Sequence, residues 1–360
     1  MKKLNQRIAK INNVLIKNSL EAFLITKMAN IEYISGFSGD DALLLIIPGK
    51  TNLIITDSRF IQEASQVEGF KPEITNQKIT KFLIAKFRKL NLKRIGFESS
   101  GLTYGQYSML KEVCKGDIDL IPLNNIIEEM RMIKDEEEIE IIKKSVEIAI
   151  TAFENLLSEL NYTYSEKTIA NRLDYLMREH GADGSAFETI VATGKNTSRP
   201  HAVPSSKIWE RKELILIDWG VRFKGYNCDL TRTIFSYKIN PIQKRTYKIL
   251  IEAQEKAVSI IKPGVKIKTI DRLIRKHLKK YKIDKFFLHS SGHGVGKEVH
   301  EPPWISRNNE TVLRENMVFT IEPAIYLEDK YGMRVEDMIR VKPNGCEVIS
   351  EKLKKYILIS

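Results

Sequence analysis

The first 125 residues alternate short apolar runs with stretches of helical spacing. The runs predict strands at 22–25, 42–47, 52–56, 94–98 and 118–121. Apolar residues three and four positions apart predict helices between them, around 57–67, 79–90 and 103–114. Strands that alternate with helices are typical of a small α/β domain. We expect it to end near residue 125, because a proline and two asparagines interrupt the pattern at 122–125.

The rest of the chain shows one order of elements twice. A long amphipathic helix is predicted from 135 to about 160, because its acidic start favours the positive end of the helix dipole. A second helix is predicted over 165–180, and strands follow at 214–217 and up to 235. Helices at 241–261 and 267–281 and strands at 318–326 and 333–341 repeat this order. The recurrence predicts two domains, 1–125 and 126–360, the second a fused duplication.

Two aspartates stand at the predicted strand pair of the first repeat. Asp218 ends the apolar run ILIDWG, and Asp229 lies in YNCDLTRT. A hairpin that turns at 223–224 makes them cross-strand partners, with Cβ atoms about 4.5–5.5 Å apart. Opposed like charges are destabilising unless a cation lies between them, which favours a metal site. An exposed pair on the rim of the hairpin is the alternative.

The second strand pair carries two glutamates in the same arrangement. Glu322 in FTIEPA and Glu336 in MRVEDM are centred on Asp329, so a symmetric hairpin sets them opposite each other. Together with the two aspartates they make four carboxylates with a charge of −4. One divalent ion leaves half of this charge uncompensated, whereas two ions neutralise it. The pattern therefore predicts a dinuclear site, and paired metals are typical of hydrolysis.

Histidines gather close to these acids in the sequence. The chain has six histidines, and the stretch HSSGHGVGKEVHEPP holds His289, His293 and His300. Gly292 and Gly294 flank His293, which suits a tight backbone that presents the ring as a ligand. The same stretch fails the P-loop and dinucleotide patterns, and the chain has no HExxH sequence. Metal chemistry is therefore favoured over phosphate binding.

Composition restricts the compartment and the partners. Of 360 residues, 58 are Lys or Arg and 46 are Asp or Glu, a net charge of +12 that raises the possibility of a nucleic acid partner. The basic residues of 272–285 lie on several faces with few aromatics between them, so a solvated surface is favoured and no nucleic acid is expected. No apolar run approaches the ~20 residues of a membrane span. Three cysteines without a CxxC pair indicate a reducing cytoplasm.

The ordered motifs resemble those of a known family. FETIVATGKNTSRPHAVPS, ILIDWG, YNCDLTRT, HSSGHGVGKEVHEPP, FTIEP and RVED resemble the pita-bread metallopeptidases, which include Xaa-Pro aminopeptidase (aminopeptidase P) and Xaa-Pro dipeptidase (prolidase). RMIKDEEEIEIIKKS resembles the start of their catalytic domain. The resemblance implies an α+β protein: a small creatinase-like α/β N-terminal domain over 1–125 and a pseudo-twofold pita-bread catalytic domain over 126–360.

The resemblance also implies roles for individual residues. Asp218 and Asp229 would bind one metal and His293 and Glu322 the other, with Asp229 and Glu336 bridging. The remaining family positions are the substrate-binding or proton-handling histidines His201, His289 and His300, and the arginine that braces the ligand carboxylates, Arg334. Cys228 departs from the small hydroxyl residue usual before the bridging aspartate, and Ala202 from the glycine or aromatic residue usual after the histidine.

The implied activity is a metallo-exopeptidase that cuts between an N-terminal residue and proline. Glu322 would accept a proton, and His201 and His300 would stabilise the oxyanion or handle protons. The oxygen-rich ligand set suits Mn²⁺, with Co²⁺ or Zn²⁺ as alternatives. A cytoplasmic homodimer acting on proline-containing peptides is expected. Dipeptidase and aminopeptidase preference both remain open, as do creatinase-like C–N hydrolysis, a non-catalytic homologue and, less favoured, a basic nucleic-acid-binding protein.

Overall fold

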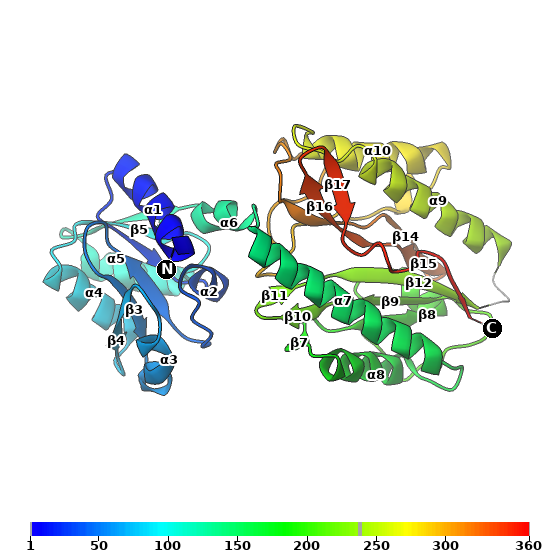
Figure 1. Ribbon diagram of the computed structural model, residues 1–360, viewed down its shortest axis with the longest axis horizontal. Helices are drawn as coiled ribbons and strands as arrows, with labels where there is room; N and C mark the ends of the chain where they lie inside the picture. The colour runs from blue at the N-terminus through cyan, green and yellow to red at the C-terminus, as the bar shows by residue number, and fades with distance from the viewer. Residues whose placement is uncertain (1, 237–239, 360) are drawn as a thin grey trace. The chain divides into compact units, whose positions relative to one another are not determined.

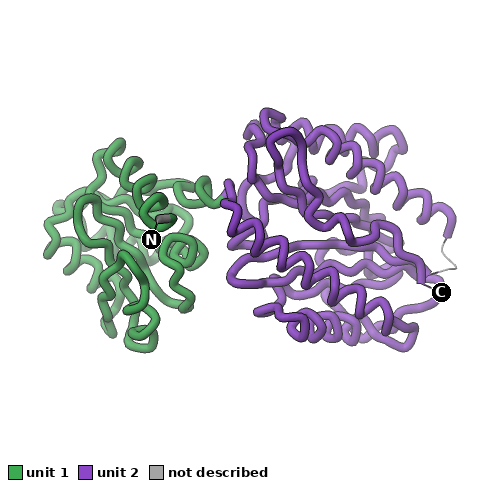
Figure 2. Tube along the Cα trace, in the orientation of Figure 1, with its two compact units in different colours: residues 1–131 green, residues 132–360 purple. Residues whose placement is uncertain are grey.

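A computed structural model describes residues 2–236 and 240–359 of the chain. It divides into two compact units, residues 1–131 and residues 132–360 (Figure 2). The sequence suggested a division after residue 125. Helix α6 (Ile126–Arg131) instead lies in the first unit, because Ile127 is buried in a hydrophobic cluster of that unit.

The first unit is built on a six-stranded sheet in the order β4-β3-β2-β1-β5-β6 (Figure 1). Only β2 runs antiparallel to its neighbours. The strands are β1 (Ala22–Ile25), β2 (Leu43–Ile46), β3 (Asn52–Thr56), β4 (Phe70–Ile74), β5 (Arg94–Glu98) and β6 (Asp119–Leu123). The helices are α1 (Lys2–Lys17), α2 (Met28–Ser35), the short η1 (Ser58–Phe60), α3 (Ile61–Ser65), α4 (Ile79–Lys89), α5 (Tyr104–Cys114) and α6.

Alternate residues of β1 enter two different cores, as a sheet covered on both faces requires. Phe23 and Ile25 pack with α1 and α2, whereas Ala22 and Leu24 pack with α4 and α5. The five predicted strands and three predicted helical regions of this unit are confirmed. Strand β4 escaped prediction because it contains Pro72, which lacks an N–H group and is tolerated on an edge strand.

The second unit repeats one order of elements, as the pattern predicted. Helices α7 (Glu136–Glu159) and α8 (Glu166–Glu179) precede β7 (Gly184–Ser185), β8 (Ile190–Thr193), the short η2 (Gly194–Ser198), β9 (Ile215–Trp219), β10 (Val221–Phe223), β11 (Tyr226–Asn227) and β12 (Leu230–Ser236). Helices α9 (Pro241–Val258) and α10 (Ile267–Lys280) precede η3 (Asp284–Phe286), β13 (Val318–Ile321), β14 (Ala324–Leu327), β15 (Tyr331–Arg334), β16 (Asp337–Lys342), β17 (Gly345–Val348) and β18 (Ile357–Ile359).

Each helix pair covers its own set of strands. In the second unit, Figure 1 shows α9 and α10 at the top of the view, α8 at the bottom, and α7 running diagonally across the lower half. One hydrophobic cluster joins α7 and α8 to β9 and β12, and another joins α9 and α10 to β13–β16. The start of α7 is fixed by a capping box, in which Asp135 accepts from the Glu138 backbone N–H and the Glu138 side chain accepts from that of Asp135.

The first hairpin of the second unit differs from its predicted register. Lys224 and Gly225 have φ values of 48° and 73° and form its two-residue turn, one position later than expected. Asp218 therefore pairs with Thr231 and not with Asp229. A shift of one position in the turn moves each partner by two residues, so the face is preserved. Asp229 becomes the diagonal neighbour of Asp218 on the same side of the sheet.

The second hairpin has the predicted register. Leu327 pairs with Tyr331 around Asp329, whose φ is 56°. The pairing of Ala324 with Arg334 continues, after a gap, as the pairing of Ile321 with Asp337. The predicted strands at 318–326 and 333–341 are therefore each interrupted, and Glu322 and Glu336 lie in the two gaps. Both ladders share one register, so the two glutamates lie opposite each other as expected.

Candidate metal centre

The two hairpins of the second unit meet along β12. The backbone N–H of Glu336 donates to the Thr231 carbonyl oxygen at 3.1 Å, and these residues form an antiparallel bridge. Two residues further along, the Thr233 hydroxyl donates to the Arg334 carbonyl oxygen at 3.0 Å. The pairing joins the strand after Asp229 to the strand before Glu336. Acidic residues separated by more than a hundred positions are thereby brought to one place.

All five predicted ligands lie in this place. Asp218, Asp229 and Glu336 offer oxygen atoms within 4.8 Å of one another. His293, Glu322 and Glu336 form a second group within the same limit, and Glu336 belongs to both. The Glu322 side chain is 12% exposed, and the other four residues are buried. We call these five residues the carboxylate cluster.

His293 carries a neutral imidazole with one nitrogen free to accept. Burial and the nearby His300 lower the pKa of the His293 imidazole to about 3. Its Nδ1 atom lies 3.2 Å from the Gly294 carbonyl oxygen, which favours the proton on Nδ1 and leaves the Nε2 lone pair free. Nε2 lies 3.5 Å from both an Asp229 and a Glu322 oxygen. Atoms about 2.1 Å from one ion stand roughly 3.0–3.4 Å apart, so this spacing is close to that of a shared metal.

The carboxylates repel one another strongly when no ion is present. Burial, followed by the charges of Glu336 and Asp218, raises the pKa of Asp229 well above its ordinary value. Burial and Glu336 do the same for Glu322. Burial and Asp218 raise the pKa of Glu336 to about 7. The ordinary ionised state of these groups therefore needs more positive charge than the protein supplies here.

One oxygen of the cluster is also without a hydrogen bond. Asp218 Oδ1 is buried, and no polar atom of the described residues bonds to it. A buried carboxylate oxygen left in this way costs about 1–3 kcal/mol or more. A cation beside it removes this cost. The orphaned oxygen, the raised pKa values and the oxygen-rich donor set all fit divalent metal ions.

Arg334 braces the cluster from one side. Its guanidinium donates to Asp218, to the Thr231 hydroxyl at 2.8 Å and to the Tyr326 hydroxyl at 2.6 Å. Thr231 in turn donates to Glu336 at 2.6 Å. A single arginine thus orients one carboxylate directly and another through a threonine. The sequence predicted this role for Arg334, but it did not predict Thr231 or Tyr326, whose ordinary strand pattern gave no signal.

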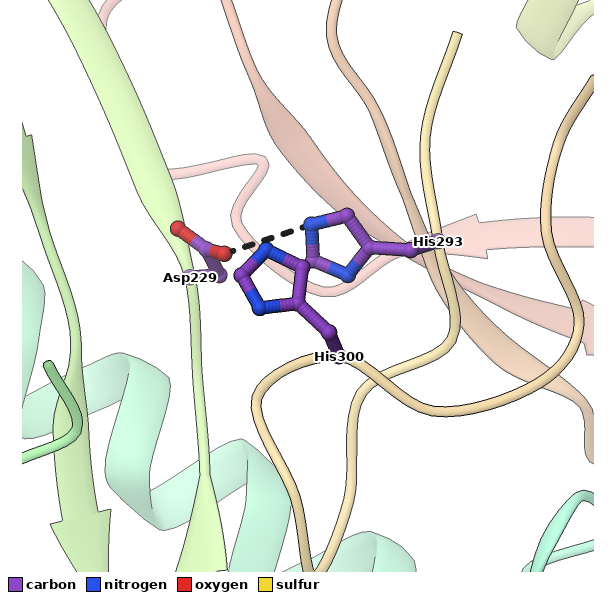
Figure 3. Close-up of side chains that lie close together, drawn as sticks. All are labelled: Asp229, His293 and His300. Atoms are coloured by element: carbon purple, nitrogen blue, oxygen red, sulfur yellow. Dashed lines mark ion pairs between the residues drawn. The ribbon is translucent and has the colours of Figure 1, made fainter. Parts of the chain in front are cut away.

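The other predicted histidines lie at the edge of the cluster. His300 is exposed, and its ring centroid lies 4.2 Å from that of His293; Figure 3 shows both rings beside Asp229. Asp229, His293 and His300 form a third group that could hold a metal ion. His289 Nδ1 lies 3.6 Å from Glu322, and its Nε2 lies 3.2 Å from the Tyr326 hydroxyl. Burial, followed by Arg334, lowers the pKa of His289 to about 4, so it is neutral.

A cavity of about 350 Å³ opens onto the cluster. His201, exposed, lines it together with Asp218, Asp229 and His300. The rest of the wall was not predicted and consists of Phe187, Glu188, Ile190, Ala202, Val203 and Pro204. These residues belong to the motif FETIVATGKNTSRPHAVPS, in which only His201 and its neighbour Ala202 were singled out from the sequence. A larger cavity of about 740 Å³ lies in the first unit and contains none of the predicted site residues.

The duplicated α+β unit and its buried carboxylate cluster are the features of a metallopeptidase. Family comparison agrees: residues 140–343 match metallopeptidase family M24, and residues 7–133 match the creatinase/prolidase N-terminal domain. The chain therefore belongs to metallopeptidase family M24. The predicted family and the predicted pairing of a creatinase-like domain with a pita-bread catalytic domain are confirmed.

The chain is similar to other proteins over nearly its whole length. A Pyrococcus horikoshii protein named Xaa-Pro dipeptidase is 39% identical over 357 residues, 98% of this chain and 99% of its own. The structure of an Xaa-Pro dipeptidase from Bacillus anthracis has a TM-score of 0.93 at 34% identity, covering 99% of this chain and 100% of its own. The structure of an X-Pro aminopeptidase from Thermotoga maritima has a TM-score of 0.86 at 37% identity, covering 95% and 98%.

Among the described residues, no helix combines the length and apolar character needed to cross a bilayer.

Proposed function

We propose that the protein hydrolyses the peptide bond between an N-terminal residue and proline, as a metal-dependent exopeptidase. The carboxylate cluster carries the proposal, because five ligand-type side chains from both repeats converge there and Asp218 Oδ1 has no other partner among the described residues. Relatives of similar length are named for Xaa-Pro peptidase activity, which supports this choice of bond.

We assign the cluster to two divalent ions. Asp218 and Asp229 would hold one ion and His293 and Glu322 the other, with Asp229 and Glu336 shared. Two ions balance the four carboxylates, as the charge count of the sequence suggested. Mn²⁺ suits a set with four carboxylates and one imidazole, and Co²⁺ and Zn²⁺ are the ions to test against it. Ions bound in this way polarise a carbonyl group and lower the pKa of water.

The surrounding side chains supply the proton transfers. Glu322 lies 3.5 Å from His293 Nε2 in the cluster, and its carboxylate can accept a proton from attacking water. His201 and His300 line the cavity and can donate to the developing oxyanion or to the departing proline nitrogen. Arg334 keeps Asp218 in place, and through Thr231 it keeps Glu336 in place. His201, His300 and Glu322 are therefore the proposed catalytic residues.

We further propose a cytoplasmic enzyme that acts as a homodimer without nucleic acid or membrane partners. Cys114, Cys228 and Cys346 are all free, which fits a reducing compartment. The dimer rests on the family resemblance, and light scattering behind size exclusion tests it. Retention on heparin at physiological salt would contradict the absence of a nucleic acid partner.

Chelation separates this function from the alternatives. Protein treated with a chelator is expected to lose hydrolysis of Ala-Pro-Ala and to regain it on addition of Mn²⁺. Asp229→Asn is expected to abolish the regained activity, whereas the exposed Asp117→Asn in the first unit is the matched control. A non-catalytic homologue or a creatinase-like C–N hydrolase shows no peptide cleavage in any of these states. Activity that is indifferent to chelation contradicts the metallopeptidase assignment.

A further inference from the structure

Sequence similarity does not separate two kinds of substrate for this site. Relatives of nearly equal identity are named dipeptidase and aminopeptidase. The two substrates differ in charge beside the bond to be cut. In an Xaa-Pro dipeptide the proline ends in a free carboxylate, whereas in a longer peptide it continues as a neutral amide. A site that cleaves dipeptides therefore needs a cation for that carboxylate.

We place this carboxylate in the cavity beside the cluster when a dipeptide binds. Two extended residues span about 7 Å, so both ends of a dipeptide cleaved at the cluster lie within this distance of it. The cavity of about 350 Å³ borders the cluster through Asp218 and Asp229. Its volume is in the range of small-ligand sites. The lining of this cavity therefore determines which charge the substrate can carry.

No lysine or arginine is among the described residues that line the cavity. Its wall combines the apolar side chains of Phe187, Ile190 and Val203 with the carboxylate of Glu188. Two divalent ions would only neutralise the four carboxylates of the cluster. Glu188 then remains as a further negative charge in the wall, beside the imidazoles of His201 and His300. Its carboxylate suits the ammonium group of a peptide and opposes a carboxylate.

Two basic residues, one at the cluster and one in the same motif as His201, do not line this cavity. Arg334 is buried, and its guanidinium donates to Asp218, Thr231 and Tyr326. Arg199 is exposed two positions before His201 and does not line the cavity.

We propose that this site selects peptides in which proline is followed by a further residue and discriminates against the free Xaa-Pro dipeptide. The inference rests on the proposed function and names its substrate class. A dipeptide carboxylate in this cavity loses hydration without gaining a cation and lies in the field of Glu188. The amide of a longer peptide has no such cost, and its chain continues out of the cavity.

Three substrates test the charge directly. Ala-Pro and Ala-Pro-NH₂ have nearly the same size and differ in the terminal charge, and Ala-Pro-Ala adds the next residue. With Mn²⁺-loaded protein, kcat/KM for the amide and the tripeptide is expected to exceed that for Ala-Pro by about tenfold or more. Hydrolysis of Ala-Pro at an equal or higher rate overturns the inference. Hydrolysis of none of the three contradicts the proposed function itself.

A variant that introduces a cation into the cavity provides the complementary test. Val203 lines the cavity and is 77% exposed, so substitution there leaves the core intact. Val203→Arg is expected to raise the ratio of Ala-Pro to Ala-Pro-NH₂ hydrolysis, whereas the neutral control Val203→Gln leaves that ratio unchanged. Equal ratios in both variants overturn the inference. Arg199→Ala is the third variant, since loss of dipeptide hydrolysis in it identifies Arg199 as the carboxylate partner and likewise overturns the inference.

Discussion

Lys134 and Glu301 form an ion pair in the interior of the second unit, and its removal has a calculable cost. Nζ lies 2.8 Å from Oε1, and the two side chains are 1% and 2% exposed. With an effective dielectric constant of 20, the attraction at this distance is about 6 kcal/mol before desolvation is counted. Lys134→Met leaves the Glu301 carboxylate buried without this partner, which costs about 3–5 kcal/mol of unfolding free energy.

The pair also bears on the candidate site. Glu301 follows His300, and its backbone N–H donates to the Gly294 carbonyl oxygen at 3.0 Å, next to His293. Its second carboxylate oxygen accepts from the Glu298 backbone N–H at 3.2 Å. Glu301 thus fixes the loop that carries both histidines. We therefore expect Lys134→Met to lower kcat as well as stability.

Urea unfolding followed by tryptophan fluorescence measures the stability effect. All three tryptophans, at positions 209, 219 and 304, lie in the second unit, so the signal reports on that unit. Lys144→Met is the matched control, because Lys144 and Glu147 are 3.0 Å apart but 51% and 62% exposed. Such a pair contributes about 0–1 kcal/mol. The double variant Lys134→Met/Glu301→Gln recovers most of the loss. The reasoning is refuted if Lys134→Met costs no more than the control.

Three further predictions concern the cluster and its surroundings. In the metal-free protein, the unfolding free energy falls as pH rises from about 6.5 to 7.5, because the raised pKa values of Asp229, Glu322 and Glu336 make the folded state bind more protons than the unfolded chain. The lowered pKa values of His289 and His293 act in the opposite direction only below about pH 6.5. Urea titrations with and without Mn²⁺ check this, and equal slopes contradict it. Arg334→Lys is expected to weaken Mn²⁺ binding about 10–100-fold in calorimetry, because one ammonium group does not replace the three separate hydrogen bonds of the guanidinium. An unchanged Kd contradicts the role of Arg334 in orienting the carboxylates. Burial raises the pKa of the Cys228 thiol to about 12, so iodoacetamide labels it only after unfolding, and labelling of the folded protein argues against it.

The sequence predicted which residues form the site, but it did not predict all of the strand pairings that bring them together. The apolar runs and the symmetry of the turns predicted that the acidic residues share one face of each hairpin. This prediction holds because side chains alternate between the two faces of a strand, so a register change of two residues leaves each side chain on its face. The predicted turn position was wrong for the first hairpin. Lys224 adopts a left-handed backbone conformation there, and a lysine gives no sequence signal for that conformation. For the second hairpin, Asp329 gave the correct centre. The breaks at Glu322 and Glu336 could not be predicted, because they depend on pairing with Thr231 from the other repeat.

Other features required the folded chain. Lys134 and Glu301 are 167 positions apart, and nothing in either local pattern marks a buried charge. The three short strands β7, β10 and β11 form a separate sheet that periodicity over two or three residues does not reveal. The cavity wall at Phe187, Glu188 and Val203 lies within a singled-out motif, but its arrangement around the cluster is a tertiary property.

Counting the bound metal ions while activity is measured decides whether the cluster is a dinuclear catalytic site. Protein stripped with a chelator is titrated with Mn²⁺, and bound ions per chain are counted while release of alanine from Ala-Pro-Ala and Ala-Pro is followed. We expect no hydrolysis without metal, full activity at two ions per chain, and fewer than two ions with no activity in His293→Ala. Full activity after chelation, or at a single bound ion, would contradict a metal-dependent site with two ions.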